Sequence, residues 1–210
     1  AVGGQLISIS GVYGDYDDLF LPLHGAHQAA NAATALAAVE VFAGETQLDE
    51  TVVREAFANA TSPGRCEIIM RNPTVIIDAA HNPHGAQSLR KTMKDEFDFD
   101  TIIAVIAPMG DKDVDGILEE LEDVVSHVIV SRNSSHRAAP LSELKSQAAS
   151  IFGNDRVTAI ESLSEALSTA IEQARLHNGV HDSNAAVLVA GSVITAGEAR
   201  GIIRRMREKK

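Results

Sequence analysis

The segment from Asp78 to Pro83 carries the densest group of chemically useful side chains in the sequence. It follows the apolar run Val75–Ile77, which places it at the carboxyl end of a predicted β-strand, where a helix begins. A carboxylate in such a loop faces backbone N–H donors, so Asp78 suits two roles equally: binding a ribose hydroxyl or holding its own loop. His81 shares this loop, and Asn82 before a proline is typical of a helix N-cap.

Three more side chains are candidates for ligand binding. Arg65 follows a Pro-Gly pair, and its planar fork of donors suits phosphate, with a solvated linker residue as the alternative. Asn31 lies in an alanine-rich helical pattern, where asparagine is unfavourable, so its amide is a candidate contact unless the position is an exposed filler. Lys112 lies among aspartates and is either their charge partner or a ligand for phosphate or carboxylate.

Several well-known kinds of site are absent from the sequence. No glycine is followed by lysine, so there is no P-loop, and no Gly-x-Gly-x-x-Gly follows a strand. With one cysteine, Cys66, the chain cannot form a Cys-x-x-Cys zinc site, and we predict buried packing for Cys66 and no metal site. His177 and His181 have the spacing of paired ligands, but Asn178-Gly179 predicts a turn between them, so both are interpreted as loop histidines.

The composition limits the class of protein. Of 210 residues, 18 are basic and 29 acidic, which gives a formal net charge of -11 and argues against nucleic-acid and anionic-membrane surfaces. Apolar residues make up 45% of the chain, as in globular proteins. We find no apolar run of membrane-spanning length and no leader-like start. The single cysteine fits the reducing cytoplasm, where we expect the protein to reside.

The pattern of elements divides the chain into two parts, 1–62 and 63–210. The glycine-rich start is too short to close a core of its own, so we interpret the first part as the end of a preceding domain. Its strands are expected at Gln5–Ser10 and Leu19–Leu23, and its helices at His27–Ala43 and Asp49–Asn59. The second part alternates apolar strands with helices, which predicts a mostly parallel, doubly wound α/β sheet with helices on both faces. Its strands are expected at Glu67–Met70, Thr74–Ile77, Thr101–Ala107, His127–Val130, Arg156–Ile160 and Ala185–Ala190, and its helices at His84–Glu96, Asp113–Val124, Leu141–Ile151, Leu163–Leu176 and Thr195–Met206.

Polar or glycine-containing loops follow four of these strands. Ligands of open parallel sheets bind at the carboxyl ends of the strands, so we expect these loops to border one site. The loops begin after Ile77, Ala107, Val130 and Ala190.

Five sequence blocks, in order, resemble the folylpolyglutamate synthase/dihydrofolate synthase family of the Mur ligase superfamily. The resemblance extends from about His24 to the end of the chain. The blocks are His27-Gln28-x-x-Asn31, Ser62-Pro63-Gly64-Arg65, Asp78-Ala-Ala-His81-Asn82-Pro83, Gly110-Asp111-Lys112-Asp113 and Ala190-Gly191-Ser192.

The resemblance implies roles for particular residues. It implies ATP contacts for Asn31, Arg65 and Asp78, and it places His81 and Ser192 near the reacting centre and the incoming glutamate. Roles for Lys112 and Arg137 are less directly implied. It also implies that residues 1–62 end a central ATPase domain whose missing part carries the P-loop, the Mg²⁺ ligands and most of the folate site.

The implied reaction is ATP-dependent joining of L-glutamate to folate or dihydropteroate through an acyl phosphate. Because the P-loop lysine is absent, we expect these 210 residues alone to be inactive. Two alternatives remain open at this point. One is another Mur-type amide ligase, acting on a peptidoglycan precursor, and the other is a non-catalytic module that binds a small ligand or a partner.

Overall fold

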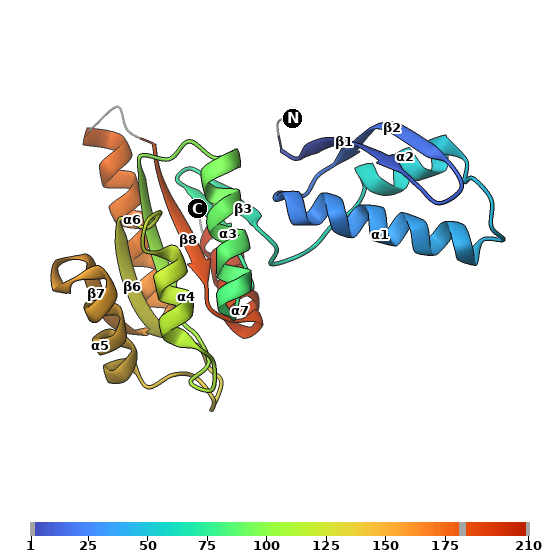
Figure 1. Ribbon diagram of the computed structural model, residues 1–210. Helices are drawn as coiled ribbons and strands as arrows, with labels where there is room; N and C mark the ends of the chain where they lie inside the picture. Colours follow the sequence, from blue (N-terminus) through green and yellow to red (C-terminus); the bar gives the residue numbers. More distant parts are fainter. Residues whose placement is uncertain (1–2, 181–183, 209–210) are drawn as a thin grey trace. The chain divides into compact units, whose positions relative to one another are not determined.

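The computed structural model describes residues 3–180 and 184–208 and divides into two compact units, Ala1–Pro63 and Gly64–Lys210 (Figure 1). We call them unit 1 and unit 2. The boundary expected from the sequence, after residue 62, lies one residue before this division.

Unit 1 is a two-stranded antiparallel sheet with two helices. Its elements are β1 (Gln5–Ser10), β2 (Asp15–Leu21), α1 (Ala26–Phe42) and α2 (Glu50–Ala58). The second strand begins earlier than the expected Leu19, because Asp15 pairs with Ser10 beside the turn. Its helices begin and end within one residue of the prediction. Asp49 caps α2 by accepting hydrogen bonds from the amides of Thr51 and Val52 at 2.8 and 3.1 Å.

A buried carboxylate holds unit 1 together. Glu40 of α1 accepts hydrogen bonds from the amide of Val12 at 2.6 Å and from the hydroxyl of Tyr16 at 2.8 Å. Burial alone would raise the pKa of Glu40, but these donors stabilise the charged form and leave its pKa lowered. The hydroxyl of Tyr16 also accepts from the amide of Leu48 at 2.8 Å, which ties the loop before α2 to the strands.

Unit 2 is a six-stranded sheet in the order β3-β4-β8-β5-β6-β7. Its strands are β3 (Glu67–Arg71), β4 (Thr74–Ile77), β5 (Thr101–Ile106), β6 (His127–Arg132), β7 (Val157–Ser162) and β8 (Ala185–Ala190). Its α-helices are α3 (Pro83–Glu96), α4 (Val114–Leu121), α5 (Leu141–Phe152), α6 (Leu163–Val180) and α7 (Val193–Glu208). Strand β3 pairs with β4 antiparallel at one side, and the other strand pairs are parallel.

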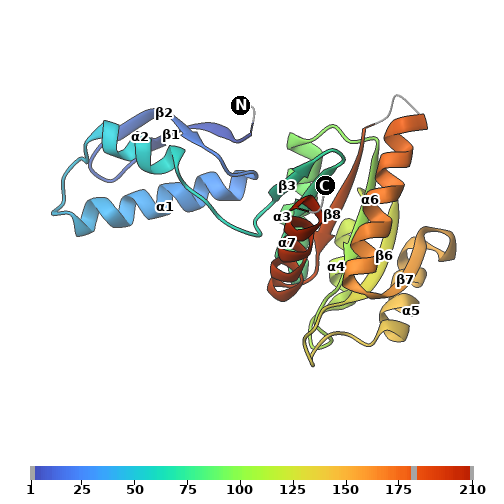
Figure 2. The same cartoon turned by 180° about the vertical axis from the view of Figure 1, so that it is seen from behind.

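Helices cover both faces of the sheet, as Figures 1 and 2 show from opposite sides. Helices α3, α4 and α5 pack on one face, through side chains such as Leu89, Ile117 and Leu144. Helices α6 and α7 pack on the other, through side chains such as Leu167 and Ile203. Every residue of β8 is buried, as a strand covered on both faces requires. The predicted doubly wound α/β fold is therefore confirmed.

The turn predicted at Asn178-Gly179 is wrong, because α6 continues through both residues to Val180. The side chain of Asn178 accounts for part of the difference between the predicted turn and the observed helix. Its side-chain oxygen accepts a hydrogen bond from the amide of Ala185 at 2.6 Å, and its amide donates to the Ala185 carbonyl at 3.3 Å, so it anchors the start of β8. His177 is thus helical, whereas His181 lies outside the described residues.

Candidate functional site

Strands β4, β8, β5 and β6 lie side by side and end at one edge of the sheet in unit 2. We call the loops that follow them, residues 78–82, 191–192, 107–113 and 133–139, the carboxyl edge. Backbone hydrogen bonds join neighbouring loops. The amide of Gly191 donates to the carbonyl of Ala80 at 3.0 Å, and the amide of Ala107 donates to the carbonyl of Ala190 at 3.1 Å.

Asp78 is a buried carboxylate that organises the loop after β4. One oxygen accepts from the amide of Cys66 at 2.8 Å, and the other accepts from the amide of Ala80 at 2.7 Å. Its own amide donates to the carbonyl of Val189 in β8 at 2.9 Å. Of the two roles open for Asp78 from the sequence, these bonds demonstrate the loop-holding one.

Arg65 is exposed at this edge, and buried residues on both sides fix its backbone. On one side the carbonyl of Gly64 accepts from the amide of Ala79 at 2.7 Å, and on the other side Cys66 donates to Asp78. Gly64 adopts φ +73°, where a side chain is strained, and an added Cβ would lie 3.4 Å from Ala196 of α7. The backbone at Arg65 is therefore held in place by its neighbours, while the Arg65 side chain is exposed to solvent.

His81 is half-buried in the same loop as Asp78. Its Nδ1 lies 3.0 Å from the carbonyl oxygen of Ala79, which only accepts, so in the neutral ring Nδ1 carries the proton and Nε2 is an acceptor. Asn82 caps α3 by accepting from the amide of Gly85 at 2.7 Å, and Pro83 is the first residue of the helix. The sequence prediction of this cap is confirmed.

Ser192 is buried and caps α7. Its hydroxyl oxygen accepts from the amide of Thr195 at 2.9 Å and lies 2.8 Å from the hydroxyl oxygen of Thr195. The preceding Gly191 adopts φ +119°, and a Cβ there would approach the backbone of Ala107 and Pro108 to 2.9 Å. Only glycine fits where the end of β8 passes so close to the end of β5.

Sequence reasoning missed two polar residues beneath this edge, Asn133 and Thr195. Asn133 donates through Nδ2 to the hydroxyl of Thr195 at 2.9 Å and lies in the loop after β6. Thr195 donates to the carbonyl of Ala107 at 2.5 Å. Position after a strand was the one available signal for Asn133. Thr195 lies in the first turn of α7, and nothing in the sequence marked it as part of a polar cluster.

The charged residues of the loop after β5 are more exposed. Arg137 bonds to the carboxylate of Asp111 at 2.5 Å, and Lys112 lies 3.8 Å from the same carboxylate. The bond to Arg137 lowers the pKa of Asp111. Lys112 is thus a local charge partner, one of the two roles the sequence left open.

Asn31 belongs to unit 1 and is exposed on α1, where its side-chain amide donates to the buried Gln28 at 3.2 Å. Of the remaining candidates, Asp78, His81 and Ser192 belong to the carboxyl edge of unit 2. Arg65 precedes β3 and adjoins this edge through the bond from Cys66 to Asp78. Within the described residues, no group of three or more His, Cys, Asp or Glu side chains is placed to hold a metal ion.

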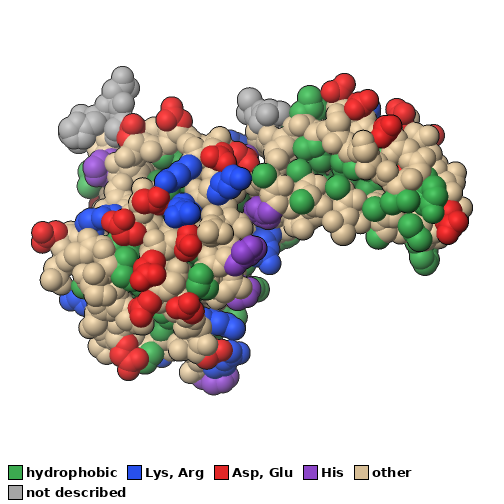
Figure 3. Space-filling view, viewed as in Figure 1, with side chains coloured by type: hydrophobic (Ala, Val, Ile, Leu, Met, Phe, Trp, Pro, Cys, Tyr) green, Lys and Arg blue, Asp and Glu red, His purple; other side chains and the backbone are tan. Residues whose placement is uncertain are grey.

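Two other surface features lie away from this edge. A hollow lined by Phe97, Asp100, Glu122 and Arg156 lies at the amino ends of β5, β6 and β7, opposite the loops described above. The face formed by α3 and α4 carries alternating acidic and basic side chains (Figure 3).

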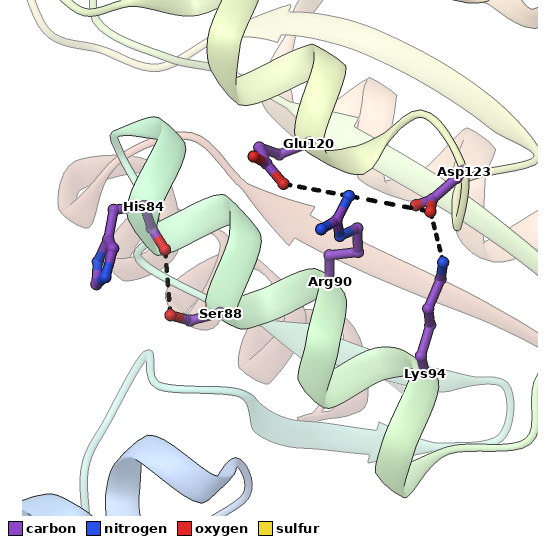
Figure 4. Close-up of polar contacts among 6 residues, drawn as sticks. All are labelled: His84, Ser88, Arg90, Lys94, Glu120 and Asp123. Atoms are coloured by element: carbon purple, nitrogen blue, oxygen red, sulfur yellow. Dashed lines mark hydrogen bonds and ion pairs between the residues drawn. The ribbon is translucent and has the colours of Figure 1, made fainter.

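Four charged residues on the α3–α4 face form ion pairs with one another. Figure 4 shows Arg90 between Glu120 and Asp123, with Lys94 on the same Asp123. Surface ion pairs of this kind contribute little to stability, and a solvated helix surface explains them adequately. In the described part of the chain, no helix is long and apolar enough to cross a membrane.

A comparison with known protein families assigns unit 2 to the ligase domains. Residues 64–193 match the family model of the Mur ligase, glutamate ligase domain, so the chain belongs to this family. The chain is 46% identical to the dihydrofolate synthase/folylpolyglutamate synthase of Mycobacterium tuberculosis over 98% of its length, and 32% identical to that of Escherichia coli over 93%. It spans 44% and 42% of those two proteins, respectively.

Solved structures agree with this assignment. A Mycobacterium tuberculosis folylpolyglutamate synthase complexed with ADP and AMPPCP matches 96% of this chain and 46% of its own, with a TM-score of 0.92 and 48% identity. The Escherichia coli FolC complex with DHPP and ADP matches 92% of this chain and 42% of its own, with a TM-score of 0.75 and 30% identity.

Proposed function

We propose that this chain is the C-terminal part of a cytoplasmic, ATP-dependent ligase that adds L-glutamate to folate or dihydropteroate. The observation that carries the proposal is the carboxyl edge itself. A fixed loop there presents an exposed arginine and a histidine with a free acceptor nitrogen, in a domain of the glutamate ligase family. Relatives that were solved with ADP and with DHPP support ATP and a folate-type acceptor as the substrates.

The reaction proceeds in two steps. The γ-phosphoryl group of ATP passes to a carboxylate of the acceptor and gives ADP and an acyl phosphate. The amine of L-glutamate then attacks the acyl carbon, loses a proton and displaces inorganic phosphate, which leaves an amide. Such catalysis depends mainly on positioning and on stabilising developing negative charge.

In this proposal Arg65 binds the phosphates of ATP. Its guanidinium is exposed and always charged, and its planar fork matches phosphate oxygens. Asp78 acts at the nucleotide end as well, because its bond to the amide of Cys66 holds the residue next to Arg65. Preorganisation of this kind lowers the entropic cost of binding.

His81 and Ser192 act at the reacting end. With Nδ1–H directed at the carbonyl of Ala79, Nε2 of His81 is an acceptor suited to the proton that the attacking amine loses. Ser192 fixes the first turn of α7 beside it.

The nucleotide-holding half of the site is assigned to polypeptide outside these 210 residues, an ATPase domain in the same protein. Support comes from unit 1, where Val39, Val41 and Phe42 at the end of α1 are 51%, 51% and 92% exposed (Figure 3). A two-stranded sheet is marginal alone, so unit 1 suits the end of a larger domain, with Asn31 among its ATP contacts. Among the described residues no group of three or more His, Cys, Asp or Glu side chains is placed to hold a metal ion, and we assign Mg²⁺ to that other half.

An isotope-transfer experiment tests the proposal. The full-length protein is incubated with ATP, L-glutamate and either dihydropteroate or a folate whose reacting carboxylate is labelled with ¹⁸O, and a peptidoglycan-precursor peptide serves as the other acceptor. We expect amide formation with the folate-type acceptor and transfer of one ¹⁸O atom to the released phosphate. Ligation of the peptide alone would assign a different Mur-type activity, and absence of any ligation would overturn the proposal.

A further inference from the structure

A buried polar cluster lies beneath the carboxyl edge. Asn133, Ser192 and Thr195 are 6%, 3% and 0% exposed, respectively. They come from the loop after β6 and from the start of α7, and they reach the backbone after β5 at Ala107. Buried polar groups destabilise a fold unless they are hydrogen-bonded, so the geometry of such a cluster is tightly specified.

The hydrogen-bond donors in the cluster can be assigned from chemistry. The carbonyl of Ala107 only accepts, so the hydroxyl of Thr195, 2.5 Å away, uses its one proton there. In the pair of hydroxyls 2.8 Å apart, Ser192 must then donate to Thr195. The oxygen of Ser192 in turn accepts from the amide of Thr195 at 2.9 Å. The hydroxyl of Ser192 is therefore oriented from below by Thr195.

Asn133 completes the cluster and joins two loops and a helix. Its Nδ2 donates to Thr195 at 2.9 Å and to the carbonyl of Ala107 at 3.1 Å, with a weaker contact to Ser192 at 3.4 Å. Its Oδ1 accepts from the amide of Ser135 at 3.0 Å, which closes its own loop. One side chain thus links the loop after β6 to the loop after β5 and to α7.

We infer that Thr195 and Asn133 are positioning residues of the ligase, which act through Ser192 to fix the first turn of α7 at the reacting end. The inference rests on the proposed function, because it gives these residues a reaction to serve. Both side chains are buried beneath Ser192, so we assign them no direct contact with substrate. A loosened first turn of α7 presents the amino-acid substrate with a less organised site, which weakens its binding while ATP binding at the Arg65 loop is unaffected.

A matched set of variants of the full-length protein tests the inference. Thr195→Val keeps the shape but removes the hydroxyl, and Thr195→Ser restores it. We expect Thr195→Val to raise KM for L-glutamate about tenfold, because it removes one or two hydrogen bonds. Its KM for ATP should stay within about twofold of the wild-type value. Thr195→Ser should return KM for L-glutamate to within about twofold of wild type. Thr92→Val is the control, since Thr92 is equally buried and bonds to Ser88 at 2.9 Å within α3.

A double-mutant cycle separates positioning from plain structural support. If Thr195 acts through Ser192, Thr195→Val should change KM for L-glutamate by less than about twofold once Ser192→Ala is present. Asn133→Asp, which places an oxygen where Nδ2 donates, should raise the same KM and provides a second variant should Thr195→Val fold poorly. Multiplicative effects in the cycle, or a loss of kcat with unchanged KM in both variants, would overturn the inference.

Hydrogen exchange distinguishes this inference from the proposed function. In the full-length protein, amides of residues 191–196 and 107–112 should exchange about tenfold faster in Thr195→Val than in wild type or Thr195→Ser. Unchanged exchange would overturn the positioning role even in an active ligase. A wild-type protein that ligates no acceptor would instead refute the proposed function, whatever the exchange shows.

Discussion

The carboxylate of Asp78 accepts a hydrogen bond from the amide of Cys66 at 2.8 Å, across 12 positions of sequence. This bond joins the end of β4 to the residue that follows Arg65. It places the exposed guanidinium of Arg65 at the same edge as His81 and the capped start of α7. The relationship makes Asp78 the structural centre of the proposed site and leads to the first prediction.

Asp78→Asn should abolish most of the activity of the full-length ligase. An amide side chain has one acceptor oxygen, so it can satisfy the amide of Cys66 or that of Ala80, but not both. We expect stability to fall by about 1–3 kcal/mol, and glutamate incorporation to fall at least about tenfold with an increased KM for ATP. Urea unfolding and steady-state kinetics provide the two measurements.

Asp49→Asn is the matched control for that substitution. Asp49 also accepts two backbone amides, at the start of α2, but asparagine caps helices equally well. Its kinetics should equal those of wild type. Equal losses in the two variants would show that the effect of Asp78 is not specific to the carboxyl edge.

Arg65→Ala should reduce ligation without loss of stability. The side chain is exposed and its backbone is held by neighbours, so its removal leaves the loop intact. We expect kcat/KM for ATP to fall about a hundredfold or more, and Arg65→Lys to recover only part of this because an ammonium lacks the planar fork. Arg71→Ala, which removes an exposed arginine at the far end of β3, should have no effect. An active Arg65→Ala enzyme would refute the phosphate-binding role.

His81→Ala should lower the rate of amide formation more than ATP binding. The ring nitrogen not bonded to Ala79 is the acceptor we assign to the amine proton, so we expect kcat to fall about a hundredfold. His84→Ala is the control, because His84 is exposed in the first turn of α3 and lies outside the loop after β4 (Figure 4). A kcat for His81→Ala within about twofold of that of His84→Ala would contradict the assignment.

The single cysteine, Cys66, should report on the Arg65 loop. Burial raises the pKa of its thiol, and the charge of Asp78 adds to the effect. A raised folded pKa contributes stability that is present below the unfolded value, about 8.5, and is lost as pH rises above it. We therefore expect wild type to lose more stability than Cys66→Ala between about pH 8 and pH 10, when urea midpoints are compared.

Thiol labelling checks the same point kinetically. In the native wild type, Cys66 should react far more slowly with a disulfide reagent than after denaturation, and Asp78→Asn should react faster. If the native protein is labelled rapidly and the labelling rate has its pH midpoint at about 8.5, the loop is open in solution.

Local chemistry made part of this structure predictable from sequence. Asn82 and Pro83 mark the start of α3 by their types alone, and continuous apolar runs predict buried parallel strands such as β8. The order of these elements places Asp78 and Ser192 at strand ends, and the structure confirms those positions.

The rest depended on contacts distant in sequence. Asn178-Gly179 has the composition of a turn, yet it is helical, and the side chain of Asn178 exchanges two hydrogen bonds with the backbone of Ala185. Asn133 and Thr195 lie 62 positions apart and become a unit only when β6 and α7 are folded. No spacing rule connects such residues, which is why the cluster beneath Ser192 was not foreseen.

We propose that the carboxyl edge is one half of a ligase centre whose nucleotide-holding half lies on other polypeptide of the same protein. The most direct test compares ATP-dependent incorporation of labelled L-glutamate into folate or dihydropteroate by the 210-residue chain and by the full-length protein, with circular dichroism to show that the chain is folded. We expect incorporation by the full-length protein and none above background by the 210-residue chain. Turnover by the chain alone, or no incorporation by the full-length protein, would contradict it.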